Sequence, residues 1–329
     1  MYQAENPLQT EKQLQRGGFD GGCEIGFACR YTPAFDEVKQ VLEKAKEQAA
    51  EKGEKIRAII GGYTVFVEPA GANVGLRYRW VFVSGGVRFY VHNNDKVAQP
   101  VRVKYCAEAL IGQNFYAVHA VILEFLRSLG CVITEEKISR VDLQVLVDKD
   151  ISEFVLAILR GCSVARSEVD KVHRVGGKIE TYTLGCSGRL QLCIYDKHKE
   201  LLKEQVSNPV KYMMVLTECI GLEWFMYKPI TRVEFRLWRD VLRNLDIHSV
   251  KDLQEKEYAL VDWLTSHWFR ILNETKVRGS ENHQDILPLW RETDNFKSRD
   301  NYKIQNSHIC LCICKSNSFR KRNACRFKV

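Results

Sequence analysis

The stretch LQLCIYDKHKE (residues 190–200) alternates between apolar and polar side chains, stops at a Tyr-Asp-Lys step and then becomes charged. Because successive side chains of a strand point to opposite faces, Leu190, Leu192 and Ile194 share one face. The other face carries Gln191, Cys193, Tyr195 and Lys197. The pattern predicts a half-buried strand with Tyr195 and Lys197 on its polar side.

Two other stretches, SRVDLQV (139–145) and RVEFRLW (232–238), alternate in the same way and place ionisable groups on one side. Their apolar sides carry valine, leucine and phenylalanine, which is typical of a strand packed on a core. The polar sides carry Arg140, Asp142, Gln144, Arg232, Glu234 and Arg236. If the three strands are neighbours, they predict one polar sheet face.

The residue types on this face suit cleavage of a phosphodiester. Carboxylates at Asp142 and Glu234 would hold a hard divalent cation, and arginines would bind phosphoryl oxygens. Tyr195 would accept the phosphoryl group, although a phenol with a pKa of ~10 lies ~4 kcal/mol from ionisation at neutral pH. The charge of Lys197 and a bound cation would favour the phenolate. The alternative is a solvated face with cross-strand ion pairs and no chemistry.

The remaining pattern predicts an α+β fold, with a mainly antiparallel sheet, helices on one face and the polar face on the other. Hairpins are expected at Ser84-Gly85-Gly86 and Cys186-Ser187-Gly188. Helices are expected over residues 32–53, capped by Thr32 and ended by Gly53, and over 114–130, where His119 is a packed residue. Two more follow the caps at Asp150 and Ser249, the latter over 249–272. The order strand, helix, hairpin occurs twice, which suggests an internal duplication.

We predict a flexible N-terminus over 1–20, the two halves of one domain over 21–130 and 131–275, and a flexible tail over 276–329. The tail ends in CKSNSFRKRNACRFKV, which has six basic residues and no acid. Such an arm would strengthen phosphate binding, or it is unrelated to the domain.

The composition is that of a globular protein: 329 residues, 45% hydrophobic, with a net charge of +8. The positive charge is compatible with a polyanionic partner. The sequence contains no secretory signal pattern and no run long enough to span a bilayer, so we expect a cytoplasmic protein. Most of the 12 cysteines lie singly in apolar patterns and are expected to be reduced and buried. The cluster Cys310, Cys312 and Cys314 lacks a second ligand pair at zinc-site spacing.

The three motifs ISRVDLQ, TYTLGCSGRLQLCIYDKHKE and TRVEFRLWR, in that order, resemble the replication initiation factor family. This family includes rolling-circle plasmid and phage initiators and relaxases of integrative conjugative elements. The resemblance covers residues 130–245 and, more weakly, the helix to about 272. It implies an endonuclease that nicks one DNA strand at an origin, becomes joined to the 5′ phosphate through tyrosine and leaves a priming 3′ end.

By this resemblance Tyr195 is the nucleophile, with Lys197 beside it, and Asp142 and Glu234 bind Mg²⁺ or Mn²⁺. Arg140, Arg189, Arg232 and Arg236 would contact DNA, whose nick site is a hairpin or single strand. A host helicase and a second copy of the chain are further expected partners. Some plasmid members have an acid where this chain has Arg236, and Asp148 or Glu200 could complete the ligand set instead.

Three functions remain open at this point. The leading hypothesis is a metal-dependent initiator of rolling-circle replication, with a conjugative relaxase as a variant that uses the same chemistry. The second is a DNA-binding protein without catalysis on the same scaffold. The third is a structural protein whose charged face pairs only with itself. If Tyr195 is not the nucleophile, another tyrosine such as Tyr182 would have to act.

Overall fold

The computed structural model describes residues 17–275, 277, 279–280 and 284–291, and these form two compact units. The motif unit contains the three motif strands, and its described residues lie within 17–24, 106–117 and 137–291. The N-terminal unit comprises residues 25–105 and 118–136. The predicted boundary at residue 130 therefore differs from the division into units. The tail, including Cys310, Cys312 and Cys314, lies outside the described residues.

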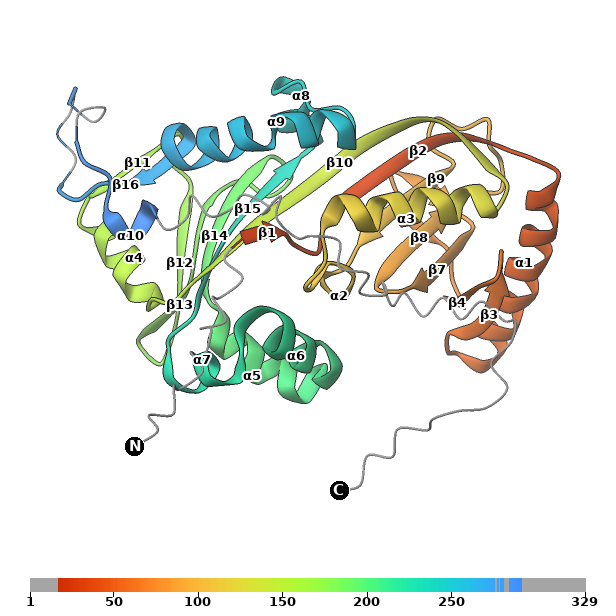
Figure 1. The fold of residues 1–329 in the computed structure, drawn as a ribbon, viewed down its shortest axis with the longest axis horizontal. Helices are drawn as coiled ribbons and strands as arrows, with labels where there is room; N and C mark the ends of the chain where they lie inside the picture. Colours follow the sequence, from red (N-terminus) through yellow and green to blue (C-terminus); the bar gives the residue numbers. More distant parts are fainter. Residues whose placement is uncertain (1–16, 276, 278, 281–283, 292–329) are drawn as a thin grey trace, which may run out of the picture. The chain divides into compact units, whose positions relative to one another are not determined.

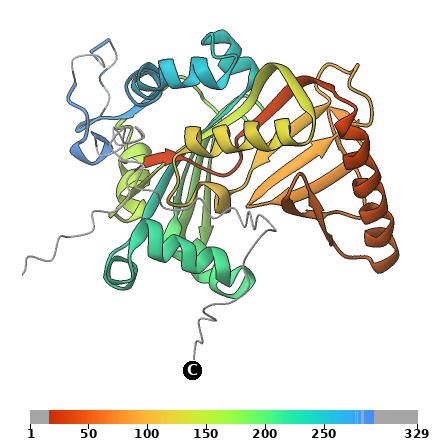
Figure 2. The same cartoon turned by 45° about the vertical axis from the view of Figure 1, so that its right-hand side comes forward.

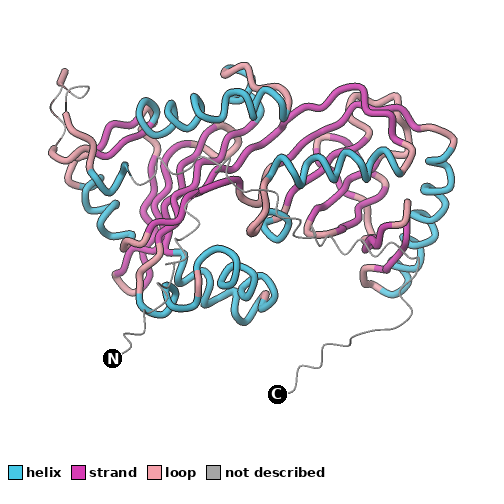
Figure 3. The backbone as a smooth tube through the Cα atoms, in the orientation of Figure 1, coloured by secondary structure: helices cyan, strands magenta, loops and turns pink. Residues whose placement is uncertain are grey.

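The motif unit is built on an antiparallel sheet in the order β12-β13-β14-β15-β10, with β1 also paired to β10 (Figures 1 and 3). The hairpin predicted at Cys186-Ser187-Gly188 joins β13 to β14 and is confirmed. The strands are β1 (Gly17–Phe19), β10 (Cys131–Val147), β12 (Asp170–Val175), β13 (Lys178–Gly185), β14 (Leu190–Asp196) and β15 (Thr231–Trp238). Residues 17–19, expected to be flexible, are thus part of the sheet.

Apolar side chains of β10, β14 and β15 form the core face that alternation predicted. Leu143, Leu192 and Phe235 are 0% exposed, and burial of each such side chain contributes ~1.5–3 kcal/mol. The ring of Phe235 meets Trp268 edge-on, with centroids 6.0 Å apart. This face therefore anchors the strands that carry the polar groups on their other side.

The helices α4 (Ile151–Leu159) and α9 (Val250–Asp262) begin at the predicted caps. Asp150 with Glu153 and Ser249 with Asp252 form capping boxes. After α9 the chain forms a π-helical turn, η2 (Trp263–Trp268), and then β16 (Phe269–Ile271), which pairs with β11 (Ser163–Ala165). The predicted helix over 249–272 is therefore too long at its end.

A second group of helices, most of them green in Figure 2, packs around Leu146 of β10. By alternation along the strand, Leu146 lies on the same side of β10 as Asp142. These helices are α2 (Ala107–Leu110), α5 (Lys197–Ser207), α6 (Pro209–Val215), the π-helical turn η1 (Leu216–Ile220) and α7 (Leu222–Tyr227). Short helices α8 (Arg239–Asn244) and α10 (Pro288–Arg291) complete the unit. Helices thus cover the apolar face and also one end of the polar face.

In the N-terminal unit the sheet strands lie in the order β2-β9-β8-β7-β4-β3, and β5 and β6 form a separate hairpin. The hairpin predicted at Ser84-Gly85-Gly86 joins β7 to β8 and is confirmed. The strands are β2 (Glu24–Tyr31), β3 (Ile56–Ile60), β4 (Tyr63–Val67), β5 (Ala72–Val74), β6 (Leu76–Tyr78), β7 (Trp80–Ser84), β8 (Val87–Val91) and β9 (Val101–Tyr105). Together with the motif unit, this sheet confirms the predicted α+β class.

Helices α1 (Ala34–Lys52) and α3 (Phe115–Ser128) match the two helices expected in this half of the chain. Gly53 ends α1 in the left-handed conformation, as predicted. The cap prediction was wrong, because Pro33 occupies that position and the Thr32 hydroxyl donates to the Gly130 carbonyl instead. His119 is a packed residue, as expected, 5% exposed and hydrogen-bonded to Tyr105.

Eight cysteines among the described residues are free thiols, and Cys131 and Cys193 are buried as expected. Cys106, Cys162 and Cys219 are partly exposed. Within the described part of the chain, no helix combines the length and apolar character that a membrane crossing requires.

Candidate active site

The tyrosine of the opening motif stands where β14 gives way to α5. Tyr195 is the penultimate residue of the strand, and the Asp196 carboxylate accepts the backbone N–H of Lys199 at 3.0 Å, which caps the helix. Lys197 is therefore the first residue of α5, and its expected place on the strand face was wrong. Its side chain is 1% exposed, and Nζ lies 2.9 Å from the Glu200 carboxylate.

The three motif strands are neighbours, so their polar groups meet on one face. In the antiparallel register Tyr195 lies opposite Arg232, and Glu234 lies between Cys193 and Gln144. One step further along, Arg236 lies opposite Asp142. The polar face predicted from alternation is thus assembled by strand pairing.

Each predicted metal ligand is held by an arginine two residues away on its own strand. Arg140 donates two hydrogen bonds to Asp142, at 2.7 and 2.6 Å, and Arg236 donates two to Glu234, at 2.8 and 3.0 Å. Such bidentate pairs are the strong form of ion pair. Both carboxylates are buried. Arg140 and Arg236, which were predicted to bind phosphate, therefore bind carboxylates in this arrangement.

Arg232 connects the tyrosine to an acid that the sequence analysis missed. Its Nη1 donates to the Tyr195 hydroxyl at 3.2 Å and to the Asp20 carboxylate at 2.6 Å. The Arg232 side chain is 10% exposed and that of Asp20 14% exposed. Asp20 follows β1, and no motif marked it. Arg189, by contrast, is exposed in the turn before β14.

Burial, together with nearby carboxylates, favours the protonated phenol of Tyr195. Burial raises the pKa of Tyr195 well above its usual value, the carboxylates of Glu234, Glu200 and Asp20 raise it further, and Arg232 opposes them. Burial also raises the pKa of Asp142 to about 7, with Glu234 and Asp20 acting in the same direction against Arg140. Burial therefore favours the neutral form of both groups, and a bound cation would act in the opposite direction and lower both pKa values.

Burial lowers the pKa of Lys197, and Arg232 lowers it further against the effect of Glu200. The ammonium group of Lys197 pairs with the Glu200 carboxylate, so Lys197 acts on the site through Glu200. Of the two acids considered for completing the ligand set, Glu200 is the one whose charge acts on Tyr195.

The oxygen-rich character of the face fits a hard cation such as Mg²⁺ or Mn²⁺. Two buried oxygens, Oε2 of Glu200 and Oε1 of Gln144, lack a hydrogen-bond partner among the described residues. In this conformation no three His, Cys, Asp or Glu side chains of the described chain are gathered closely enough to hold a metal. Arginine side chains instead bind the carboxylates of Asp142 and Glu234.

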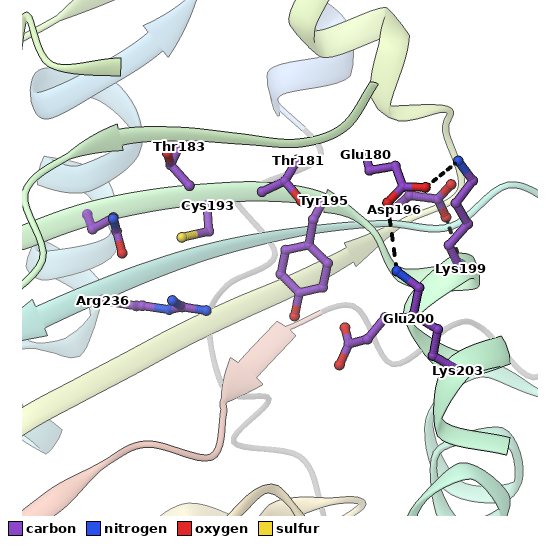
Figure 4. Close-up of a pocket in the computed structure, with 11 residues that line it drawn as sticks. Glu180, Thr181, Thr183, Cys193, Tyr195, Asp196, Lys199, Glu200, Lys203 and Arg236 are labelled. Carbon is purple, nitrogen blue, oxygen red and sulfur yellow. Dashed lines mark hydrogen bonds and ion pairs between the residues drawn. The ribbon is translucent and has the colours of Figure 1, made fainter. Parts of the chain in front are cut away.

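A pocket of about 480 Å³ opens onto this face (Figure 4). Tyr195 projects into it from β14, and Glu200 and Lys203 line it from α5. Lys199 and Lys203 pair with Glu180 on β13, at 3.1 and 3.8 Å. Thr181, Thr183, Gln191, Cys193, Asp196 and Arg236 complete the lining. The tyrosine is therefore accessible to a ligand that follows β13 and β14.

Gly22, in the loop after β1, makes room for the Asp142 carboxylate. Its φ is +125°, and a Cβ at this position would overlap Asp142 Oδ2. We expect Gly22→Ala to lower the free energy of unfolding by ~1–3 kcal/mol, because the added methyl group displaces the Arg140–Asp142 pair and strains the backbone. Urea denaturation would measure the change.

The matched control is Gly18→Ala, in the same segment. Gly18 also has a positive φ, +156°, but no atom lies within 4 Å of the place that a Cβ would take. An equal loss in the two variants would show that Gly22 is not required for the close approach of Asp142.

Comparison with known proteins relates the chain to a replication-associated family. Residues 107–256 match the family model of the N-terminal part of a phage replication-associated protein. A search of curated proteins finds no match. Among solved structures, a rolling circle replication initiator protein from Geobacillus stearothermophilus is similar, with 12% sequence identity and a TM-score of 0.45, over 84% of this chain and 94% of that chain. The matched family segment is just under half of the chain and contains all three motif strands, so over this segment the chain is similar to replication-associated proteins, which confirms the predicted resemblance.

Proposed function

We propose that the protein is a metal-dependent enzyme that nicks and rejoins one DNA strand at a replication origin through Tyr195. The observation that carries the proposal is the position of Tyr195, whose hydroxyl bonds to Arg232 on a sheet face that also presents Asp142 and Glu234. This face lies within the segment that matches a replication-associated family.

In the proposed reaction the phenol oxygen of Tyr195 forms a bond to the scissile phosphorus, and the bond from phosphorus to the 3′ oxygen breaks. The products are a 5′-phosphotyrosyl ester and a free 3′-hydroxyl, so the energy of the bond is retained for rejoining. Arg232, which already contacts the tyrosine hydroxyl, would bind a non-bridging phosphoryl oxygen, as a guanidinium does in phosphoryl transfer.

Asp142 and Glu234 are the residues that would hold the divalent cation, with Glu200 or Gln144 as a third oxygen donor. The bound cation would act as a Lewis acid toward the phosphate and favour loss of the phenol proton. For this the two carboxylates must exchange their arginine partners for the metal. The released guanidinium groups of Arg140 and Arg236 would then be available to the DNA backbone, which reconciles their predicted role with their observed pairing.

The test is incubation of a supercoiled plasmid carrying the cognate origin with the protein and Mn²⁺. We expect nicked circles with protein attached at the 5′ end and a 3′ end that a polymerase extends. Nicked circles without attached protein would point to hydrolysis by water. A conjugative relaxase would give the same products, and the neighbouring genes would distinguish it. A non-catalytic DNA-binding protein would retain the plasmid without nicking it.

Metal binding can be tested without DNA by thermal melting. With Mn²⁺ at about 100 times its Kd, binding to the native state stabilises by ~2.7 kcal/mol, which we expect to raise the melting midpoint by ~4 °C. Glu234→Gln should remove most of this rise. The control is Glu255→Gln, whose carboxylate is 61% exposed. No rise in the unsubstituted protein would favour a structural face whose charges pair only with one another.

A further inference from the structure

A second pocket, of about 450 Å³, lies beside the tyrosine pocket in the motif unit. The two pockets share Asp196 and Lys199 as lining residues. Because these two residues line both pockets, a strand bound at the tyrosine reaches the second pocket within a short distance.

The second pocket has an apolar side that is exposed. Leu202 of α5 is 46% exposed, and Met226 and Tyr227 at the end of α7 are 62% and 78% exposed. The His198 ring, which also lines the pocket, stacks on Phe225, with centroids 4.3 Å apart and planes 12° from parallel. Exposed aromatic and thioether groups beside a pocket are the contacts that a flat nucleobase requires.

The polar rim of the same pocket favours a phosphate backbone. Lys149, Lys199 and Lys228 line it, and of these Lys199 also pairs with Glu180 of the tyrosine pocket. The two acids of the rim, Asp150 and Asp196, are the N-caps of α4 and α5, and each carboxylate accepts a backbone N–H. Because these negative charges face helix N-termini, they offset less of the lysine charge toward the pocket.

We propose that this pocket binds an unpaired nucleobase of the DNA strand, next to the phosphate that Tyr195 attacks. This inference rests on the proposed function and adds the place where a base beside the nick is held. The continuity of the two pockets and the lysine rim favour DNA over an apolar segment of a partner protein. Tyr227 would stack on the base, and Lys149 would contact the adjoining phosphate.

The test uses short single-stranded oligonucleotides of mixed sequence that carry one 4-thiothymine, a base that cross-links to side chains it touches under near-ultraviolet light. The protein carries Tyr195→Phe, so that no strand is cleaved. We expect cross-links in the peptide that contains Met226 and Tyr227. Tyr227→Ala should weaken oligonucleotide binding about tenfold, the usual loss when a stacking platform is removed, and should reduce these cross-links.

The matched control is Tyr258→Ala on α9, where the side chain is 67% exposed. Cross-links confined to residues of the tyrosine pocket, with binding unchanged by Tyr227→Ala, would overturn the inference and leave the proposed function intact. Failure of the protein to bind the oligonucleotides would overturn both. Specific binding of an apolar peptide that the oligonucleotides do not displace would assign the pocket to a protein partner instead.

Discussion

Replacing Tyr195 with phenylalanine is expected to abolish the covalent protein–DNA product and to lower the nicking rate by on the order of 10⁴-fold or more. The substitution removes the oxygen that would attack phosphorus and leaves the ring in place. The hydroxyl contributes one hydrogen bond, accepted from Arg232 at 3.2 Å, so the loss in the free energy of unfolding should be ~1 kcal/mol. A nicking assay on origin DNA with Mn²⁺ would measure the rate.

Tyr182→Phe is the control for this experiment. Tyr182 lies on the neighbouring strand β13, opposite Ile194, and is 2% exposed on the apolar side of the sheet. Its hydroxyl is thus remote from the polar face, and nicking should continue at its normal rate in this variant. If Tyr195→Phe still forms covalent adducts, or if only Tyr182→Phe loses them, Tyr195 is not the nucleophile.

The alternation of apolar and polar residues was sufficient to predict the strands and faces that position this tyrosine. Leu143, Leu192 and Phe235 are buried on one side, as the period of two requires, and Asp142 and Glu234 lie on the other. The hairpins were predictable because glycine-containing turns mark them locally. The side-by-side arrangement of β10, β14 and β15 did not follow from periodicity, and was expected only from the combination of residue types.

Contacts between residues that are far apart in the sequence could not be predicted from local sequence patterns. Asp20 is 212 positions from Arg232 and lies in a short loop without periodicity, so nothing in the sequence linked the two. The place of Lys197 was missed because Asp196 caps α5 and ends the strand one residue earlier than alternation suggested. The arginine pairs of Asp142 and Glu234 were not foreseen either, although the spacing of two residues placed each pair on one face.

Substitution of Arg232 with methionine is expected to lower the free energy of unfolding by ~3–5 kcal/mol. Arg232 is buried and pairs with Asp20 at 2.6 Å, so its loss leaves a largely buried carboxylate without its counter-charge. Asp20→Asn should have a similar effect, because it leaves the guanidinium without its acid. Chemical denaturation of each variant would measure both changes. The exposed pair of Arg243 and Asp240 provides the comparison, since its loss should change stability by no more than ~0.5 kcal/mol.

The free energy of unfolding of the double variant at Arg232 and Asp20 shows whether the two residues stabilise the fold through each other or independently. If Arg232 and Asp20 stabilise the fold mainly through each other, Arg232→Met with Asp20→Asn should cost ~1–3 kcal/mol less than the sum of the single changes. Additive losses would show that each residue acts through other partners.

The pair of Arg232 and Asp20 also bears on catalysis, because the same guanidinium nitrogen donates to Tyr195. Asp20→Asn should therefore slow nicking even where the protein is fully folded, whereas unchanged nicking would mean that Arg232 keeps its place beside the tyrosine without Asp20.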